Sequence, residues 1–166
     1  MHIACARPHT RIMSLIIEAP AFEPGQRIPD QFSRDGANVS PRLEWHGAPE
    51  DTRSFALVLE DPDAPRGTFR HWAAYDIPRN VSWLDEGAGS SSCGSAMRMA
   101  RNDWGDWRYD GPHPPPGHGE HHYHFRLFAL DVPELGLPDE ATADQVLDAA
   151  RGHVIAEADV IGTFER

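Results

Sequence analysis

The sequence contains no lysine, so its 15 positively charged side chains are all arginine, and they are outnumbered by 26 carboxylates. The formal net charge of -11 gives a surface that repels nucleic-acid phosphates and anionic lipid headgroups unless a local basic patch overcomes the mean field. The sequence shows no such patch. We therefore expect neither nucleic-acid binding nor stable membrane association.

Cysteine is also scarce. Cys5 and Cys93 lie far apart, and neither belongs to a Cys-x-x-Cys pair, which argues against a disulfide framework or a cysteine metal site. The first dozen residues lack the apolar core of a signal peptide, and no apolar run reaches membrane-spanning length, so a cytoplasmic location is predicted. Met13 is an alternative start, which would make residues 1–12 a disordered extension and residues 13–166 the single domain.

Short apolar segments separated by proline and glycine clusters make up most of the chain. Turn residues between these segments favour an antiparallel, mostly β domain. Within 54–60, Phe55, Leu57 and Leu59 share one face, and this segment is predicted to lie in the core of the sheet. The predicted strands are SLIIEA (14–19), SFALVLE (54–60), RHWAAYDI (70–77), YHFRLFAL (123–130) and DVIGTF (159–164).

One helix is predicted near the C-terminus. Thr142 and Gln145 have the spacing of a capping box, and Gly152 weakens the continuity of the helix that follows. The apolar positions at helical spacing are Val146, Ala149, Ala150 and Val154. The segment 87–95, rich in glycine and serine, is predicted to be a loop.

Acidic and imidazole side chains gather in the segment EDPDAPRGTFRHW, residues 60–72. Asp61 and Asp63 follow a predicted strand directly, and His71 opens the next one. If these strands are hairpin neighbours, Asp61 and His71 lie at the same end of the sheet, where a pocket can form. Taken singly, each has a structural explanation, since Asp-Pro-Asp initiates turns and a lone histidine is usually structural.

A second polar segment, GPHPPPGHGEHHYHF (111–125), contains five of the ten histidines. Its proline-rich first half predicts a rigid loop, and its second half alternates as a strand does. His121 and Tyr123 then project to one side of the strand, and His122 and His124 to the other. An imidazole beside a phenol offers hydrogen-bond donors to an oxyanion, and a nearby aspartate would favour the protonated imidazole. The pattern predicts a site that recognises anions.

These segments, EDPDAP with the following HW and YDGPHPPPGHGEHHYHFRLFALD, resemble the two signature regions of the phosphatidylethanolamine-binding protein family, also called the Raf kinase inhibitor protein family. The resemblance runs in consistent order from about Leu15 to Arg166. Three flanking segments are similar to its bacterial and archaeal branch: DGANVSPRLEW (35–45), RNDWG (101–105) and GHVIAEADVIGTFER (152–166).

The resemblance implies a mostly β fold in which a large central antiparallel sheet packs with a smaller sheet, with one or two peripheral helices. It also implies an anion pocket at the end of the large sheet. The implied pocket residues are Asp61, His71, His121 and Tyr123, with Gly111, Pro112, Pro114 and Pro115 as the wall, and Asp63, His113 and His118 as candidates for the rim. Bacterial relatives commonly have cysteine at the position of His113, so their ligand preference does not carry over to this chain.

The leading hypothesis is therefore a cytoplasmic, non-catalytic protein that binds phosphate, carboxylate or a zwitterion such as a phosphoethanolamine headgroup, without a cofactor. One alternative is a regulator that inhibits a kinase or protease through the pocket rim, although no segment identifies its protein partner. A second alternative is a metal-dependent hydrolase, since Asp and His also serve in such sites. The sequence contains neither a Gly-x-Ser-x-Gly nor a His-Glu-x-x-His motif, and we assign no catalytic or metal-binding residue. The resemblance further suggests a homodimer.

Overall fold

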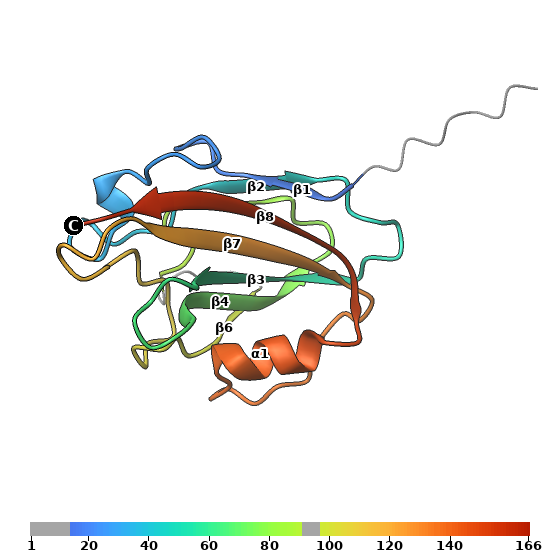
Figure 1. Ribbon diagram of the computed structural model, residues 1–166. Coiled ribbons are helices and arrows are strands. Elements are labelled where there is room, and N and C mark those ends of the chain that lie inside the picture. The colour runs from blue at the N-terminus through green and yellow to red at the C-terminus, as the bar shows by residue number, and fades with distance from the viewer. Residues whose placement is uncertain (1–13, 91–96) are drawn as a thin grey trace, which may run out of the picture.

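The computed structural model describes residues 14–90 and 97–166, which form two antiparallel β-sheets and one α-helix (Figure 1). The large sheet has five strands in the order β6-β4-β3-β7-β8, and the small sheet has three in the order β1-β2-β5. The predicted architecture of a large and a small antiparallel sheet with a peripheral helix is therefore confirmed. In chain order the elements are β1 (Ile16–Glu18), the 3-10 helix η1 (Asp30–Phe32), β2 (Leu43–His46), β3 (Ser54–Asp61), β4 (Phe69–Pro78), β5 (Trp83–Leu84), β6 (Arg98–Met99), β7 (His121–Leu130), α1 (Ala143–Ala150) and β8 (Val154–Phe164).

Some sequence predictions concern positions outside the described residues. These are the extension at 1–12 with Cys5, the alternative start at Met13, and the part of the predicted loop at 91–95, Cys93 included. Within the described ranges, no helix has the length and apolar character needed to cross a membrane.

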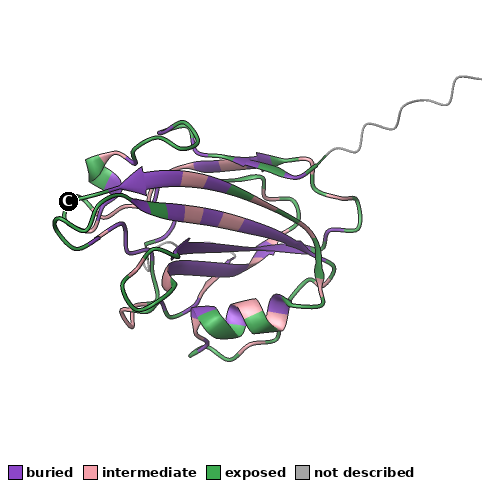
Figure 2. Ribbon diagram, in the orientation of Figure 1, coloured by how far each residue is buried: buried purple, intermediate pink, exposed green. Residues whose placement is uncertain are grey.

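Strand β3 lies at the centre of the large sheet, and all its residues are buried (Figure 2). Phe55, Leu57 and Leu59, predicted to share a face, pack in one core cluster with the small sheet. Ala56 and Val58 face the other way and pack in a second cluster with α1. The large sheet is the middle layer of three, which explains why β3 is apolar on both faces.

Helix α1 begins as the sequence predicts. The backbone N–H of Gln145 donates to the Thr142 hydroxyl oxygen (3.2 Å), and the Thr142 N–H donates to Oε1 of Gln145 (2.9 Å). The helix ends at Ala150, however, so the prediction that Val154 belongs to it is wrong: Val154 is the first residue of β8. Gly152 has φ +91°, a left-handed conformation that redirects the chain between the two elements.

Strand β4 contains two β-bulges, one near each end of its pairing with β3. At one end Leu59 pairs with Trp72 and Glu60 pairs with Arg70, which leaves His71 as the extra residue. At the other end Ala56 lies opposite two residues of β4, Tyr75 and Asp76. A bulge bends its strand and re-aims the extra side chain, so the bulges decide where His71 and Asp76 point.

The capping box gives a test of the helix boundary. Thr142→Ala removes the oxygen that accepts from the Gln145 N–H, and we expect it to lower the free energy of unfolding by about 1 kcal/mol. Thr142→Ser keeps that oxygen and should restore most of the loss. Urea denaturation measures the free energy of unfolding of both variants, and its dependence on urea concentration should not change. An equal loss of stability in Thr142→Ser would contradict the capping role.

Candidate anion-binding site

His71 is buried, and two backbone carbonyls hold its imidazole. Its Nδ1 lies 2.9 Å from the carbonyl oxygen of Asp110 and 3.0 Å from that of Gly111. Because carbonyl oxygens only accept hydrogen bonds, Nδ1 carries the proton and Nε2 keeps a lone pair. Burial lowers the pKa of His71 from 6.5 to about 4, despite the opposing effect of these carbonyls and of the Asp61 charge. At neutral pH the ring is therefore uncharged, and its free nitrogen, Nε2, is a hydrogen-bond acceptor.

Aromatic rings fix the orientation of the His71 imidazole. Phe69 and Trp104 contact it edge-on, with ring centroids 5.1 and 4.8 Å away. The guanidinium of Arg34 lies 4.3 Å above the Trp104 ring and brings a positive charge to this side of the site. The rings keep water away from the imidazole and restrict its rotation.

His121 forms the second imidazole of the site and is bonded at both nitrogens. Its Nδ1 lies 2.7 Å from Oδ2 of Asp61, and both side chains are buried. Since a carboxylate only accepts, Nδ1 of His121 donates to Asp61. The other nitrogen, Nε2, lies 2.6 Å from Nδ1 of His118, which is the donor when the pair is neutral. His118 is exposed and lies between Gly117 and Gly119, so it covers the polar edge of His121 from the solvent side.

Tyr123 lies next to His121 on the buried face of β7, two residues along the strand. Its ring meets that of His71 edge-on at 5.3 Å. Its hydroxyl is buried and has no hydrogen-bond partner among the described residues. Burial raises the pKa of Tyr123 well above its usual value, and the Asp61 charge adds to this, so the hydroxyl keeps its proton. The site therefore holds a donor that lies close to the Asp61 carboxylate but makes no hydrogen bond of good geometry within the described residues.

Of the glycine and prolines named for the wall, Gly111 contacts the site through its carbonyl oxygen, which lies 3.0 Å from Nδ1 of His71. Gly111, Pro112 and Pro114 are buried, whereas Pro115 is exposed. A Cβ atom added to Gly111 would lie 1.9 Å from the carbonyl oxygen of Phe32, so only glycine fits there without a backbone shift. Prolines have no N–H, and this wall consequently gives a ligand few backbone donors.

Asp63 braces the loop after β3 against β7. Its Oδ2 accepts from both the backbone N–H and Nδ1 of His122, at 2.8 Å each, while its own N–H donates to Oδ1 of Asp61 at 2.8 Å. Burial alone would raise the pKa of Asp63, but the hydrogen bonds from His122 outweigh it and lower the pKa. Asp63 thus connects the site carboxylate Asp61 with the exposed face of β7.

His113 lies on the Arg166 side of the wall, partly exposed. Its Nδ1 is 3.4 Å from Asp35, and its Nε2 is 3.4 Å from the guanidinium of Arg166. Burial and the charge of Arg166 lower its pKa. The structure does not join His113 to the Asp61–His121 pair by any hydrogen bond within the described residues.

A residue that the sequence analysis did not single out, Asp110, organises the site from beneath. Its carboxylate is buried and accepts from the side-chain amides of Asn38 (3.0 Å) and Asn102 (2.8 Å). Asn38 in turn accepts from the backbone N–H of Gly111 at 2.7 Å. Both asparagines lie in segments that the sequence analysis singled out, DGANVSPRLEW and RNDWG. Those segments did not show that the two amides donate to the carboxylate of Asp110.

No group of three or more His, Cys, Asp or Glu side chains suited to a metal ion is found in the described part of the chain. The structure brings Asp61, His71, His121 and Tyr123 together at one end of the large sheet, with His118 over them. The chain is therefore a β domain of two antiparallel sheets. A buried cluster of imidazole and carboxylate groups lies at one end of its large sheet.

Comparisons with known proteins give the family. The family model described as phosphatidylethanolamine-binding protein matches residues 18–165. A UPF0098 protein of Aquifex aeolicus is 42% identical over 146 residues, which cover 88% of this chain and 85% of that protein. The chain belongs to the phosphatidylethanolamine-binding protein family, as its sequence segments suggested.

A solved structure and a further relative are also similar to most of this chain. E. coli YbcL, described as a new member of the mammalian PEBP family, matches with a TM-score of 0.88 at 28% identity and covers 92% of this chain and 99% of its own. A Mycobacterium tuberculosis protein named as a lipoprotein, LppC, is 40% identical over 154 residues, which cover 91% of this chain and 72% of that protein.

The depressed pKa of His71 predicts a pH-dependent stability. Unfolded His71 binds a proton near pH 6.5 and the folded residue only near pH 4, so falling pH favours the unfolded chain across this interval. Between pH 7 and pH 5 this one group should remove about 2 kcal/mol of the free energy of unfolding. His71→Asn keeps an N–H donor but does not titrate. Urea denaturation at both pH values should show a smaller loss in the variant, and equal losses would contradict the buried neutral imidazole.

The wall predicts a second stability effect. Gly111→Ala forces the Phe32 backbone to shift, and we expect it to lower the free energy of unfolding by about 3 kcal/mol. Gly25→Ala makes the same chemical change at φ +82° with no atom near the new Cβ, and its backbone strain should lower the stability by only about 1 kcal/mol. Thermal and urea denaturation compare the two. Equal losses would mean that the contact of Gly111 with Phe32 is not tight.

Proposed function

We propose that this protein is a non-catalytic ligand-binding protein whose site takes a phosphate-type group that carries a hydrogen-bond donor of its own. The observation that carries the proposal is the fixed tautomer of His71. Its Nδ1 proton is used by the carbonyls of Asp110 and Gly111, so Nε2 can only accept at neutral pH.

The other free group of the site complements this acceptor. The buried Tyr123 hydroxyl makes no hydrogen bond of good geometry within residues 14–90 and 97–166 and can donate to a ligand oxygen. A suitable ligand thus accepts from Tyr123 and donates to His71. Monohydrogen phosphate, a phosphate monoester in its protonated form, and phosphoethanolamine through its ammonium group all meet this condition. Sulfate does not, because it has no proton at neutral pH.

His118 competes with the ligand for the Nε2 atom of His121. Nε2 of His121 already accepts from His118, so a ligand that reaches His121 must replace this contact. His118 is exposed and flanked by glycines, which allows it to move away without disturbing β7. The Asp61–His121 bond lies beneath it and can persist while the ligand replaces His118.

Support for a non-catalytic role comes from how the site uses its groups. The Asp61 carboxylate and the Nδ1 protons of His71 and His121 are all engaged in internal hydrogen bonds. No serine, threonine or cysteine contributes to the cluster formed by the described residues named above. The cytoplasmic location, the homodimer and inhibition of a kinase or protease through the pocket rim stay predictions. Cell fractionation tests the location, since one relative is named as a lipoprotein.

A histidine-resolved NMR titration of the full chain at pH 7.5 tests the proposal with phosphate, phosphoethanolamine and sulfate at matched ionic strength. Phosphate and phosphoethanolamine should shift the resonances of His71 and His121 saturably. Sulfate should bind at least about tenfold more weakly, since it leaves the buried acceptor of His71 unsatisfied. Equal binding of sulfate would contradict the donor requirement, and no saturable shift with either phosphate ligand would contradict the binding function.

Two alanine variants locate the binding. His121→Ala should weaken phosphate binding by about tenfold or more, because it removes a polar group that faces the ligand. His122→Ala is the matched control, since His122 is the adjacent histidine and points to the exposed side of β7. A similar weakening in both variants would show that phosphate binds to the histidine-rich surface rather than to the buried site.

A further inference from the structure

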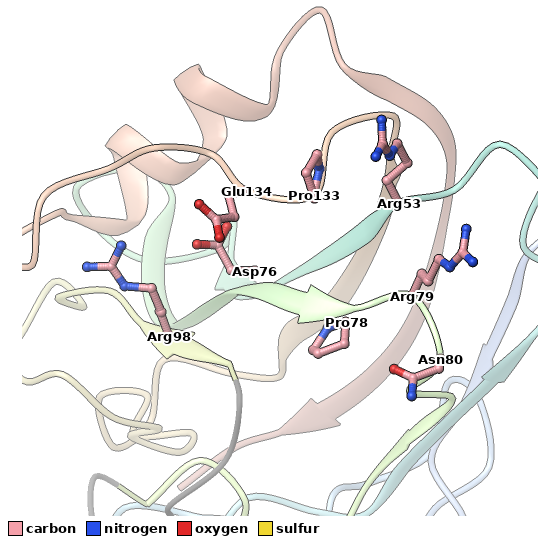
Figure 3. Close-up of a pocket in the computed structure, with 8 residues that line it drawn as sticks. All are labelled: Arg53, Asp76, Pro78, Arg79, Asn80, Arg98, Pro133 and Glu134. Atoms are coloured by element: carbon pink, nitrogen blue, oxygen red, sulfur yellow. The ribbon is translucent and has the colours of Figure 1, made fainter.

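A cavity lies at the end of the large sheet opposite the His71 cluster, where β3 begins and β4 ends. Its volume is about 690 Å³, within the range typical of small-molecule sites. Eight residues of β3 at a rise of roughly 3.3 Å each separate it from Asp61 by about 25 Å. The charged residues that line it are Arg53, Arg79 and Arg98, with Asp76 and Glu134 (Figure 3).

Two of these arginines lack partners. Among the arginines of the described ranges, only Arg53, Arg66 and Arg79 have no ion pair, side-chain hydrogen bond or aromatic contact. Arg53 precedes Ser54 and Arg79 follows Pro78, and Ser54 pairs with Pro78, so both arginines lie at the same end of the sheet. In a protein of net charge -11, two unpaired guanidiniums on one cavity form a local positive site that the mean charge conceals.

Two carboxylates lie on the other side of the cavity, where the charge of Arg98 acts on Asp76 without forming an ion pair with it. Figure 3 shows Asp76 and Glu134 beside each other, across the cavity from Arg53 and Arg79. Neither carboxylate has an ion-pair partner among the described residues. The nearby Arg98 is engaged by Asp139 and by the carbonyl oxygen of Leu137 (2.9 Å). The cavity therefore presents two guanidiniums on one side and two carboxylates on the other, and none of the four forms an ion pair within the described ranges.

The backbone around Asp76 is unusual and directs its side chain. Asp76 lies in the second bulge of β4 with φ +54°, a left-handed conformation that is unfavourable for a non-glycine residue. Its Oδ1 accepts from the backbone N–H of Leu135 at 2.9 Å, which attaches the segment after β7 to the edge of the cavity. Residues with a strained backbone persist only where the surrounding structure holds them in place, and they are found most often at ligand and active sites.

We infer that this cavity binds a small zwitterion. Its anionic group is held by Arg53 and Arg79 with the amide of Asn80, and its ammonium group is held by Asp76 and Glu134. A simple anion would meet the two carboxylates, and a simple cation would meet the two guanidiniums, so only a ligand with both charges is matched at both ends. The site is separate from the cluster at His71 and does not depend on the function proposed for it.

Three probes with the same six-carbon chain test this inference: 6-aminohexanoate, hexanoate and hexylammonium. NMR titration of the full chain follows the backbone amides of Asn80 and Glu134 and the Nε resonances of Arg53 and Arg79. The zwitterion should give saturable shifts at millimolar concentration. Hexanoate and hexylammonium should each bind at least about tenfold more weakly, since each loses one charged contact. No saturable shift with 6-aminohexanoate, or equal binding of hexanoate, would overturn the inference.

Variants with matched charge identify the groups. The double variant Arg53→Gln with Arg79→Gln should abolish 6-aminohexanoate binding. The control Arg66→Gln with Arg151→Gln has the same change in net charge at exposed positions outside the cavity and should bind normally. Glu134→Gln should reduce the preference for the zwitterion over hexanoate. If the control double variant loses 6-aminohexanoate binding equally, the effect comes from the mean charge. If Glu134→Gln still prefers 6-aminohexanoate over hexanoate to the same extent, Glu134 does not bind the ammonium group. His121→Ala should leave this binding intact, which separates it from the first site.

Discussion

The buried carboxylate of Asp110 is the constraint on which the first site depends. A buried charge is unfavourable unless hydrogen bonds or ions compensate it, and here Asn38, Asn102 and the guanidinium of Arg108 (3.3 Å) supply that compensation. Asn38 is distant in the sequence, whereas Asn102 and Arg108 belong to the segment that leads into Asp110. Because Asp110 cannot move without breaking the whole arrangement, its carbonyl and that of Gly111 are fixed in front of His71. The chemistry of the imidazole, acceptor rather than donor, follows from that placement.

Much of the fold could be predicted because it depends on local periodicity. The alternation at His121, His122 and Tyr123 correctly separated buried from exposed side chains on β7. The capping box placed the start of α1 at the observed residue. Periodicity failed at Val154, because apolar spacing continues across Gly152 whereas the backbone does not. Gly152 is a weak point of the predicted helix, but the spacing of apolar side chains does not show whether a glycine takes a left-handed conformation.

The candidate site could be predicted only in part, for a different reason. Hairpin geometry and strand alternation, together with the family resemblance of their segments, pointed to Asp61, His71, His121 and Tyr123, and the structure brings them together. The direction of each hydrogen bond could not be found in this way. The bulge at His71 and the neighbours of Asp110 lie outside any repeating pattern, and a count of charges could not show that Arg53 and Arg79 lack partners.

The two bulges of β4 have a consequence for how this chain can vary. Between them, Trp72, Ala73 and Ala74 pair with Leu59, Val58 and Leu57 in the most deeply buried part of the sheet. Side chains alternate along this stretch, so one inserted or deleted residue would turn Trp72 out of one core and into the other. The number of residues between His71 and Asp76 in β4 is therefore fixed by the packing of the core. Substitutions can tune either end separately, but the spacing between them is tied to the core and can change only if the domain is rebuilt.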